Sequence, residues 1–390
     1  MNQEEQPLAT HVAANEQAAG PVAGPMHPLP VEPPETRFLK WTMFGSEGLR
    51  CGWSAALFVI LTAIFMSALG SASSLIVDGV LHIMTGQFSP ASAIAGETIS
   101  VLAILAAGAI AARIEGRRIR NYYLSEPRKM RHFLSGAAGG FVALSALVGV
   151  LYKANFLALA STTLAGAQIL EFGLLWAIVF LFTGFFEEGS FRCYLLYTLA
   201  RGMNFWWSAG CVAVLTLLVL VIPGSNGAGG VYLMAGLGVV PCLLLQLKAA
   251  PSSGFWQAAW FTSTSFGYIH TFNQGETWIG IFAAAAIGFV FCVSIRLTGS
   301  VWWAIGFHGA WDWAQTFFYG TPDSGFVSVG HFLTAHPIGS AIWSGGADGP
   351  EGSVLVIPIV LLTLFALLVV YGRKRRALES SSATVQPQLS

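Results

Sequence analysis

The chain has 390 residues, of which 55% are hydrophobic and only 10% are charged. A soluble domain carries roughly a quarter charged residues, because its surface has to stay hydrated. The formal net charge is zero, which argues against the basic surface that a nucleic-acid-binding protein needs. The cysteines stand singly, without a Cys-x-x-Cys pair, so neither a disulfide framework nor a thiolate metal site is expected.

Residues 1–40 are rich in Ala, Pro, Glu and Gln and lack apolar periodicity, so we expect a disordered N-terminal tail. The tail has no basic segment followed by an apolar one, and a cleaved signal peptide is not expected. From Trp53 onward, apolar stretches recur that are long enough to cross a hydrocarbon core of about 30 Å. The sequence therefore predicts an all-α, polytopic transmembrane helix bundle of about ten membrane-spanning helices.

The hydropathy pattern divides the chain beyond its tail into five parts. These are N-terminal membrane helices (41–171), a membrane core with the polar motifs (172–318), a loop (319–352), a last membrane helix (353–372) and a basic, polar C-terminal tail (373–390). In chain order the predicted spans are 53–70, 92–112, 134–152, 172–199, 205–222, 231–247, 255–273, 278–296, 301–318 and 353–371.

Basic residues predict the orientation of the bundle. Arginines and lysines crowd between Arg113 and Arg131, and a second basic cluster, Arg373–Arg376, follows the last span. Short loops rich in Lys and Arg stay in the cytoplasm. We therefore expect both termini in the cytoplasm and the 319–352 loop outside. The expected location is a bacterial cytoplasmic membrane, in which the chain is an integral protein. We assign no role to the histidines of that loop, His331 and His336.

The fourth span carries three ionisable residues, Glu187, Glu188 and Arg192. Each such group costs about 2.5–3.5 kcal/mol at the centre of a membrane helix. Glu188 and Arg192 share a helix face at i, i+4 spacing, which predicts an ion pair. Glu187 lies about 100° around the helix, out of easy reach of that arginine. The spacing thus predicts one paired and one available glutamate.

Two later spans add histidines, in Phe266-Gly-Tyr-Ile-His270 and in Gly306-Phe-His308-Gly-Ala-Trp-Asp312. His308 and Asp312 share a face of their helix at i, i+4 spacing. By helix counting, Glu187 falls near mid-span, His270 late and His308 early, so these groups meet only if the helices tilt. Each element alone is also compatible with a structural role, such as a hydrogen bond between helices.

Other polar residues of the membrane region are weaker candidates. Glu97 lies within the second span and could line a cavity, but it has no partner by spacing. Glu171 lies at a span end, where a side chain can reach the interface. Asp78 and His82 fall between spans and are expected at the membrane surface.

The motifs Glu-Glu-x-x-x-Arg, Phe-x-x-x-His and His-x-x-x-Asn/Asp, on successive membrane helices, resemble those of the CPBP intramembrane proteases. This family includes the type II CAAX prenyl endopeptidases and bacterial Abi or bacteriocin-processing relatives. The resemblance covers about residues 172–318 and includes the run from Gly299 to His308. It implies the following site residues: Glu187 as the catalytic glutamate, Glu188 and Arg192 as its supporting pair, His270 and His308 as further polar groups, and Asp312 at the Asn/Asp position.

Two features depart from the family pattern. The interval between Glu188 and His270 is longer than usual, which predicts that spans five and six form an inserted hairpin. Such a hairpin preserves the direction of the next helix. The last motif ends in Asp312, and a carboxylate lacks the donor of an amide, so a carboxylate role is expected there.

We expect the chain to be an intramembrane endopeptidase in which Glu187, as general base, takes a proton from a water and later passes one to the leaving amine. The two histidines either bind a divalent metal such as zinc together with Glu187, or orient the water and stabilise the oxyanion. The residues leave both alternatives open, although His-Glu-x-x-His is absent. Gly-x-Ser-x-Gly is also absent and Ser190 has no evident base, so a serine hydrolase is not expected.

The expected partners are the lipid bilayer and a peptide or membrane-protein substrate, lipidated or not, and no nucleic acid. Two other classes of protein are compatible with the same residues. One is a non-catalytic immunity or scaffold protein of this fold. The other is a proton-coupled transporter with a relay of carboxylates and histidines, which the lack of an internal repeat disfavours.

Overall fold

The structure, a computed structural model, describes residues 34–373 except 47, 77–88, 162–163, 222–243, 245–252 and 274. Several predictions therefore lie outside the described residues. They concern the first 33 residues of the tail, nearly all of the sixth span, Asp78, His82 and the C-terminal tail beyond Arg373.

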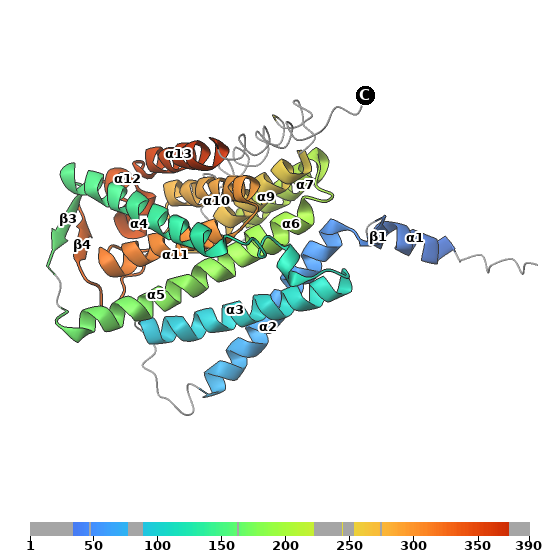
Figure 1. The fold of residues 1–390 in the computed structure, drawn as a ribbon, viewed down its shortest axis with the longest axis horizontal. Helices are drawn as coiled ribbons and strands as arrows, with labels where there is room; N and C mark the ends of the chain where they lie inside the picture. Colours follow the sequence, from blue (N-terminus) through green and yellow to red (C-terminus); the bar gives the residue numbers. More distant parts are fainter. Residues whose placement is uncertain are drawn as a thin grey trace, which may run out of the picture.

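Long helices form most of the described chain (Figure 1). In chain order they are α1 (Pro34–Met43), α2 (Cys51–Ile76), α3 (Pro90–Ile114), α4 (Lys129–Lys153), α5 (Ala167–Glu188), α6 (Leu196–Leu199), α7 (Phe205–Val221), α9 (Ser253–His270), α10 (Trp278–Thr298), α11 (Trp302–Trp313), α12 (Ala341–Ser344) and α13 (Val356–Leu367). Turns of π-helix extend α5, α11 and α13 over Gly189–Leu195, Ala314–Phe318 and Leu368–Gly372.

Two antiparallel ribbons are the extended elements of the described chain. Strands β1 (Phe44–Gly45) and β2 (Gly48–Leu49) form the first ribbon. Strands β3 (Leu157–Ala160) and β4 (Thr334–Pro337) form the second, with Leu157 opposite Pro337. These ribbons are short, and the bundle itself consists of helices. The prediction of an all-α bundle is therefore confirmed.

Five helices in the described part of the chain are long and apolar enough to cross a membrane. They are Cys51–Ala72, Pro90–Ile114, Lys129–Lys153, Ala167–Leu199 and Trp278–Thr298. Large apolar side chains such as Val142, Leu217 and Phe365 are exposed on the bundle, as expected for side chains that face lipid. The chain is therefore an integral membrane protein. Fewer helices qualify than the predicted ten, partly because α7, α11 and α13 have only 17, 12 and 12 residues.

Residues 34–40, which the sequence analysis assigned to the N-terminal tail, belong to α1. The prediction of disorder up to residue 40 is wrong for this stretch. Proline is well tolerated in the first turn of a helix, and α1 begins at Pro34. Glu35 near its start and Lys40 near its end also match the helix dipole.

Glycines allow α4 and α11 to pack with their backbones in close approach. A Cβ atom on Gly136 would lie 2.1 Å from the carbonyl oxygen of Trp303, and one on Gly140 would lie 2.1 Å from that of Phe307. Small residues four apart are typical of close helix contacts in membranes. This packing holds α11, which carries His308, in the interior of the bundle.

The chain returns from the predicted insertion close to the point where it enters. A Cβ atom on Gly254, at the start of α9, would lie 2.7 Å from the carbonyl oxygen of Ala200, just after α6. Helix α9 therefore begins beside the end of α6, as an inserted hairpin requires. Of the two helices predicted for this hairpin, α7 is described.

Candidate active site

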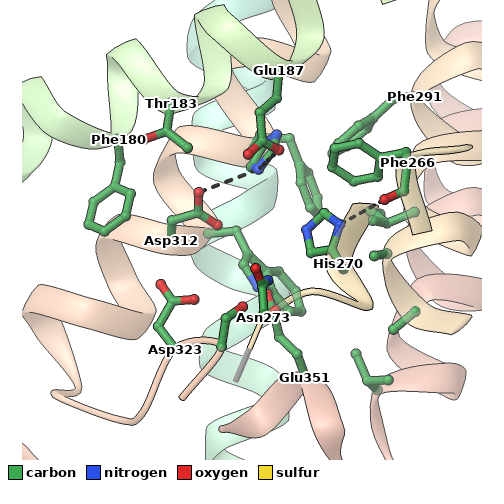
Figure 2. A pocket seen from close by; sticks show the side chains of 18 of the residues that line it. Phe180, Thr183, Glu187, Phe266, His270, Asn273, Phe291, Asp312, Asp323 and Glu351 are labelled. Carbon is green, nitrogen blue, oxygen red and sulfur yellow. Dashed lines mark hydrogen bonds and ion pairs between the residues drawn. The ribbon is translucent and has the colours of Figure 1, made fainter. Parts of the chain in front are cut away.

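A cavity of about 380 Å³ lies in the bundle, with walls from α3, α5, α9, α10, α11 and α13 and from the loop 319–352 (Figure 2). Four of the predicted site residues line it: Glu187, His270, His308 and Asp312. The other polar lining residues are Glu97, Thr183, Asn273, Asp323, Ser324, Glu351 and Thr363. The helices thus bring the three sequence motifs, far apart along the chain, to one enclosed space.

The ion pair predicted between Glu188 and Arg192 forms behind the cavity wall. Nη1 of Arg192 donates to Oε1 of Glu188 at 3.1 Å, and both side chains are 0% exposed. The pair lies where α5 changes into its π-helical turn. π-Helical turns within α-helices occur frequently at functional sites.

Aromatic rings enclose the Arg192 guanidinium. Its central carbon lies 4.2 Å from the ring centroid of Phe266 and 5.6 Å from that of Phe291. A Cβ atom on Gly288 would lie 2.0 Å from Nη2 of Arg192. A cation over an aromatic face is attracted by the ring quadrupole, and Gly288 leaves the space that the guanidinium occupies. The sequence analysis did not identify this glycine.

His308 lies between the two glutamates. Its Nδ1 donates to Oε1 of Glu188 at 2.9 Å. Its Nε2 lies 3.6 Å from Oε2 of Glu187 and 3.4 Å from Oδ2 of Asp312. The helix spacing placed Glu187 out of reach of Arg192, the partner of Glu188. In the structure the carboxylates of Glu187 and Glu188 nevertheless approach opposite nitrogens of the His308 ring.

Glu187 keeps one carboxylate oxygen without a hydrogen bond. Oε2 is buried and has no hydrogen-bond partner within the described chain, although the side chain as a whole is 20% exposed. Figure 2 shows the carboxylate of Glu187 entering the cavity from α5, above Asp312. Oε2 of Glu188 lacks a hydrogen-bond partner as well, so the feature that distinguishes Glu187 is its place in the cavity lining.

His270 is the last residue of α9 and faces the cavity (Figure 2). Its Nδ1 donates to the carbonyl oxygen of Phe266 at 2.7 Å, within the same helix. This bond fixes the ring orientation and leaves Nε2 for a water or a substrate. Gly267 lets α9 approach α10, because a Cβ there would lie 2.8 Å from the carbonyl oxygen of Ile281.

Comparison with known families identifies part of this site. Residues 240–314 match the Rce1-like family of type II CAAX prenyl endopeptidases. The chain carries a type II CAAX prenyl endopeptidase-like domain. This family implies a membrane protease. No curated protein and no solved structure matches the chain.

The matched part of the endopeptidase-like domain contains His270, His308 and Asp312. Glu187 and Glu188 precede it, on α5. The structure nonetheless places both glutamates against His308. The site thus extends beyond the matched segment.

The expected metal ligands were Glu187, His270 and His308. Among the described residues, no group of three or more His, Cys, Asp or Glu is arranged to hold a metal ion. Nδ1 of His308 is already bonded to Glu188, and Nδ1 of His270 to a carbonyl oxygen. Both bonds leave Nε2 of the ring available, as in a metal-ligating histidine. A metal held by Glu187, His270 and His308 therefore stays a proposal, and we derive no step through one.

The loop 319–352, expected outside the membrane, lines one side of the cavity. Thr316 donates a 2.7 Å hydrogen bond to Asp323, and the indole nitrogen of Trp311 donates to Glu351. Asp323, Ser324 and Glu351 all line the cavity. In the sequence, acidic residues in a loop otherwise rich in Gly and Ser could have indicated that the loop contributes to the cavity.

A second acidic residue of this loop, Asp348, is hydrogen-bonded to the start of α10. Asp348 accepts hydrogen bonds from the backbone nitrogen and the hydroxyl of Thr277, at 3.0 and 2.7 Å. Asn273, which lines the cavity, donates to Glu276 at 3.1 Å. Burial and the nearby Asp348 carboxylate raise the pKa of Glu276 to about 8, and burial raises the pKa of Asp348 to about 6.

The loop histidines lie outside the cavity lining. The ring nitrogens of His331 lie 2.9 Å from the carbonyl oxygen of Ser328 and 3.0 Å from the hydroxyl of Thr334. His336 lies in β4 opposite Ala158. Both positions agree with the sequence analysis, which gave these histidines no role.

Proposed function

We propose that the chain is an intramembrane endopeptidase that hydrolyses a peptide bond in a membrane-associated or exported peptide or protein. The observation that carries this proposal is the asymmetry of the two glutamates. Glu188 is fully buried and paired with Arg192 and His308, and it does not line the cavity, whereas Glu187 lines the cavity and has no arginine partner. A carboxylate that is free to accept a proton is what a general base requires.

In the proposed reaction, Glu187 takes a proton from a water in the cavity, and the oxygen of that water attacks the carbonyl carbon. His308 Nε2 faces the same space as Glu187 Oε2, and when protonated it donates to the developing oxyanion. His270 Nε2 orients the water or the substrate. Asp312, beside His308 Nε2 at 3.4 Å, favours the protonated ring as an anion.

The membrane arrangement that we propose has ten spans and both termini in the cytoplasm of a bacterial cell. Tyr371, at the end of the last helix, lies 2.7 Å from Ser135, in the first turns of α4. The basic segment 113–131 precedes α4, and the basic cluster 373–376 follows Tyr371. The end of the segment 113–131 and Arg373 therefore belong to one end of the bundle, as the positive-inside rule requires. The return of the chain beside Ala200 supports a hairpin within the insertion.

The substrates to test are peptides with and without a lipid chain. Apolar residues such as Phe180, Phe291 and Ile359 form much of the cavity lining, so an apolar chain or side chain is compatible with it. The description of the matched family names CAAX prenyl endopeptidases, which act on lipidated substrates. Lipidated and unlipidated versions of each peptide separate these two substrate classes.

The experiment compares wild type with Glu187→Gln for cleavage of quenched peptides by the purified protein in lipid vesicles. We expect the variant to lose about 10²–10⁴-fold in kcat. Glu171→Gln is the matched control, because Glu171 lies on the same helix but is exposed and away from the cavity. A chelator should leave turnover unchanged; turnover that a chelator abolishes and zinc restores would instead establish a metalloprotease.

Other outcomes separate the alternative functions. If wild type and Glu187→Gln are equally inactive but bind a partner equally well, the chain is a scaffold or immunity protein. Substrate-stimulated proton flux across the vesicle membrane, lost in Glu187→Gln, would identify a transporter.

A further inference from the structure

A second intramembrane glutamate faces the cavity from α3, outside the matched domain. Glu97 lines the cavity together with Ala93 and Gly96 of the same helix. It lies beside the hydroxyl of Thr183 and within electrostatic range of Glu187 and His308. Thr183 and Glu187 are four residues apart on α5, so Glu97 faces the turn of α5 that leads to the catalytic glutamate.

Glu97 has no charged partner of its own in the described chain. Its Oε2 is buried and accepts no hydrogen bond from any residue that the structure describes. Helix α2, which packs against α3, contributes no Asp, Glu, Lys, Arg or His over its length. The other titratable residues around the cavity are Glu187, His270, His308, Asp312, Asp323 and Glu351. None of the lining residues is an Arg or a Lys.

Two neighbouring carboxyl groups in such a cavity are not both ionised at low cost, because like charges and burial each favour the neutral form. Glu187 has the closer cation partner, since His308 Nε2 lies 3.6 Å from it. Glu97 is then the group that keeps its proton. A pair of carboxyl groups with opposite protonation states is the arrangement that supplies a base and an acid in one site.

We propose that Glu97 is a catalytic acid that protonates the leaving amine, while Glu187 acts as the base. This inference rests on the proposed function. Glu187 removes one proton from water, and the resulting C–O bond forms the tetrahedral intermediate. The carboxyl proton of Glu97 passes to the amide nitrogen as the C–N bond breaks, giving an amine and a carboxylic acid. Transfer of the proton from Glu187 to Glu97 then restores both groups.

The test uses two substrates that differ only in their leaving group. One is a peptide with a scissile amide, and the other carries an aryl ester at the same bond. An amine leaves only when it is protonated, whereas a phenolate leaves without a proton. In Glu97→Gln we expect kcat for the amide to fall about 10²–10⁴-fold and kcat for the ester to change by less than about tenfold. Glu187→Gln should lose both activities, and Glu171→Gln neither.

Equal losses for amide and ester in Glu97→Gln would overturn the inference, as would no loss for either. If wild type hydrolyses neither substrate, the proposed function itself fails. Carbodiimide labelling then tests the protonation of Glu97 without any turnover, because carbodiimides react with protonated carboxyl groups. We expect mass spectrometry to find the label on Glu97 and not on Glu187 at pH 7. An unlabelled Glu97 would overturn the inference.

Discussion

The Nδ1 atom of His308 donates a 2.9 Å hydrogen bond to Oε1 of Glu188, the same oxygen that accepts from Arg192 at 3.1 Å. One buried carboxylate therefore connects the π-helical turn after α5 with α11. Because Nδ1 of the imidazole is the donor in this bond, Nε2 is left to face Glu187 and Asp312. Glu188 thus orients the His308 ring, whereas Glu187 lines the cavity.

The first prediction concerns the buried pair itself. Glu188→Gln leaves the Arg192 guanidinium without a counter-charge, although its side chain is 0% exposed. Removing one partner of a buried ion pair costs about 3–5 kcal/mol. We expect this loss in the free energy of unfolding, measured by reversible denaturation in mixed micelles.

Glu187→Gln is the matched control for that measurement. Its side chain is 20% exposed and no Arg or Lys is paired with it in the described chain, so it should change the free energy of unfolding by less than about 1 kcal/mol. Equal destabilisation by both substitutions would contradict the different roles of the two glutamates.

A second prediction concerns the space that Gly288 leaves for Arg192. A Cβ atom at this position would lie 2.0 Å from Nη2. The guanidinium cannot move away without losing Glu188 or the ring of Phe266, 4.2 Å from it. Gly288→Ala should therefore destabilise the protein by about 1–3 kcal/mol, as overpacking does. Gly210→Ala, where a Cβ meets no atom within 4 Å, should be neutral or stabilising; both variants are measured by the same reversible denaturation in mixed micelles.

A third prediction concerns the contact between α4 and α11. In Gly140→Ala, the added carbon would lie 2.1 Å from the backbone oxygen of Phe307, next to His308. Backbone atoms cannot rotate aside, so α11 has to shift and take His308 away from the glutamates. We expect kcat to fall by at least about 10²-fold, since small misplacements of catalytic groups have effects of this size.

Gly149→Ala, on the same helix but with open space around it, is the control for this substitution and should retain wild-type turnover. Wild-type turnover in Gly140→Ala as well would show that the position of α11 does not depend on this contact.

A fourth prediction concerns pH. Burial, followed by the charge of Asp348, raises the pKa of Glu276 to about 8 from its ordinary value of 4.5. The folded state therefore holds a proton that the unfolded state releases. This contribution to stability is fully present below the unfolded pKa and is lost as pH rises through the folded one. The unfolding temperature of wild type should thus fall between pH 5 and pH 9, and Glu276→Gln should reduce that fall by a few degrees.

Glu171→Gln serves as the control here too, because it removes an exposed carboxyl group and should keep the wild-type slope. If the unfolding temperature depends on pH identically in wild type and Glu276→Gln, this carboxyl group does not contribute to the pH dependence of stability.

The sequence by itself determined the membrane class, the chemical groups and their local pairing. Long apolar runs predict spanning helices because bilayer thickness sets their length. The i, i+4 spacing predicted the pair of Glu188 and Arg192, because helix geometry alone places them on one face. The motifs also named four of the residues that line the cavity, Glu187, His270, His308 and Asp312.

Only the tertiary structure decided which groups from different helices meet. His308 and Glu188 are 120 positions apart, and their contact depends on the crossing of α5 and α11, which local spacing does not encode. The same holds for the space at Gly288, for Glu97 beside Thr183 and for the loop acids at the start of α10. Each of these relationships arises from side chains that fill the space between packed helices, and that packing is a property of the whole bundle.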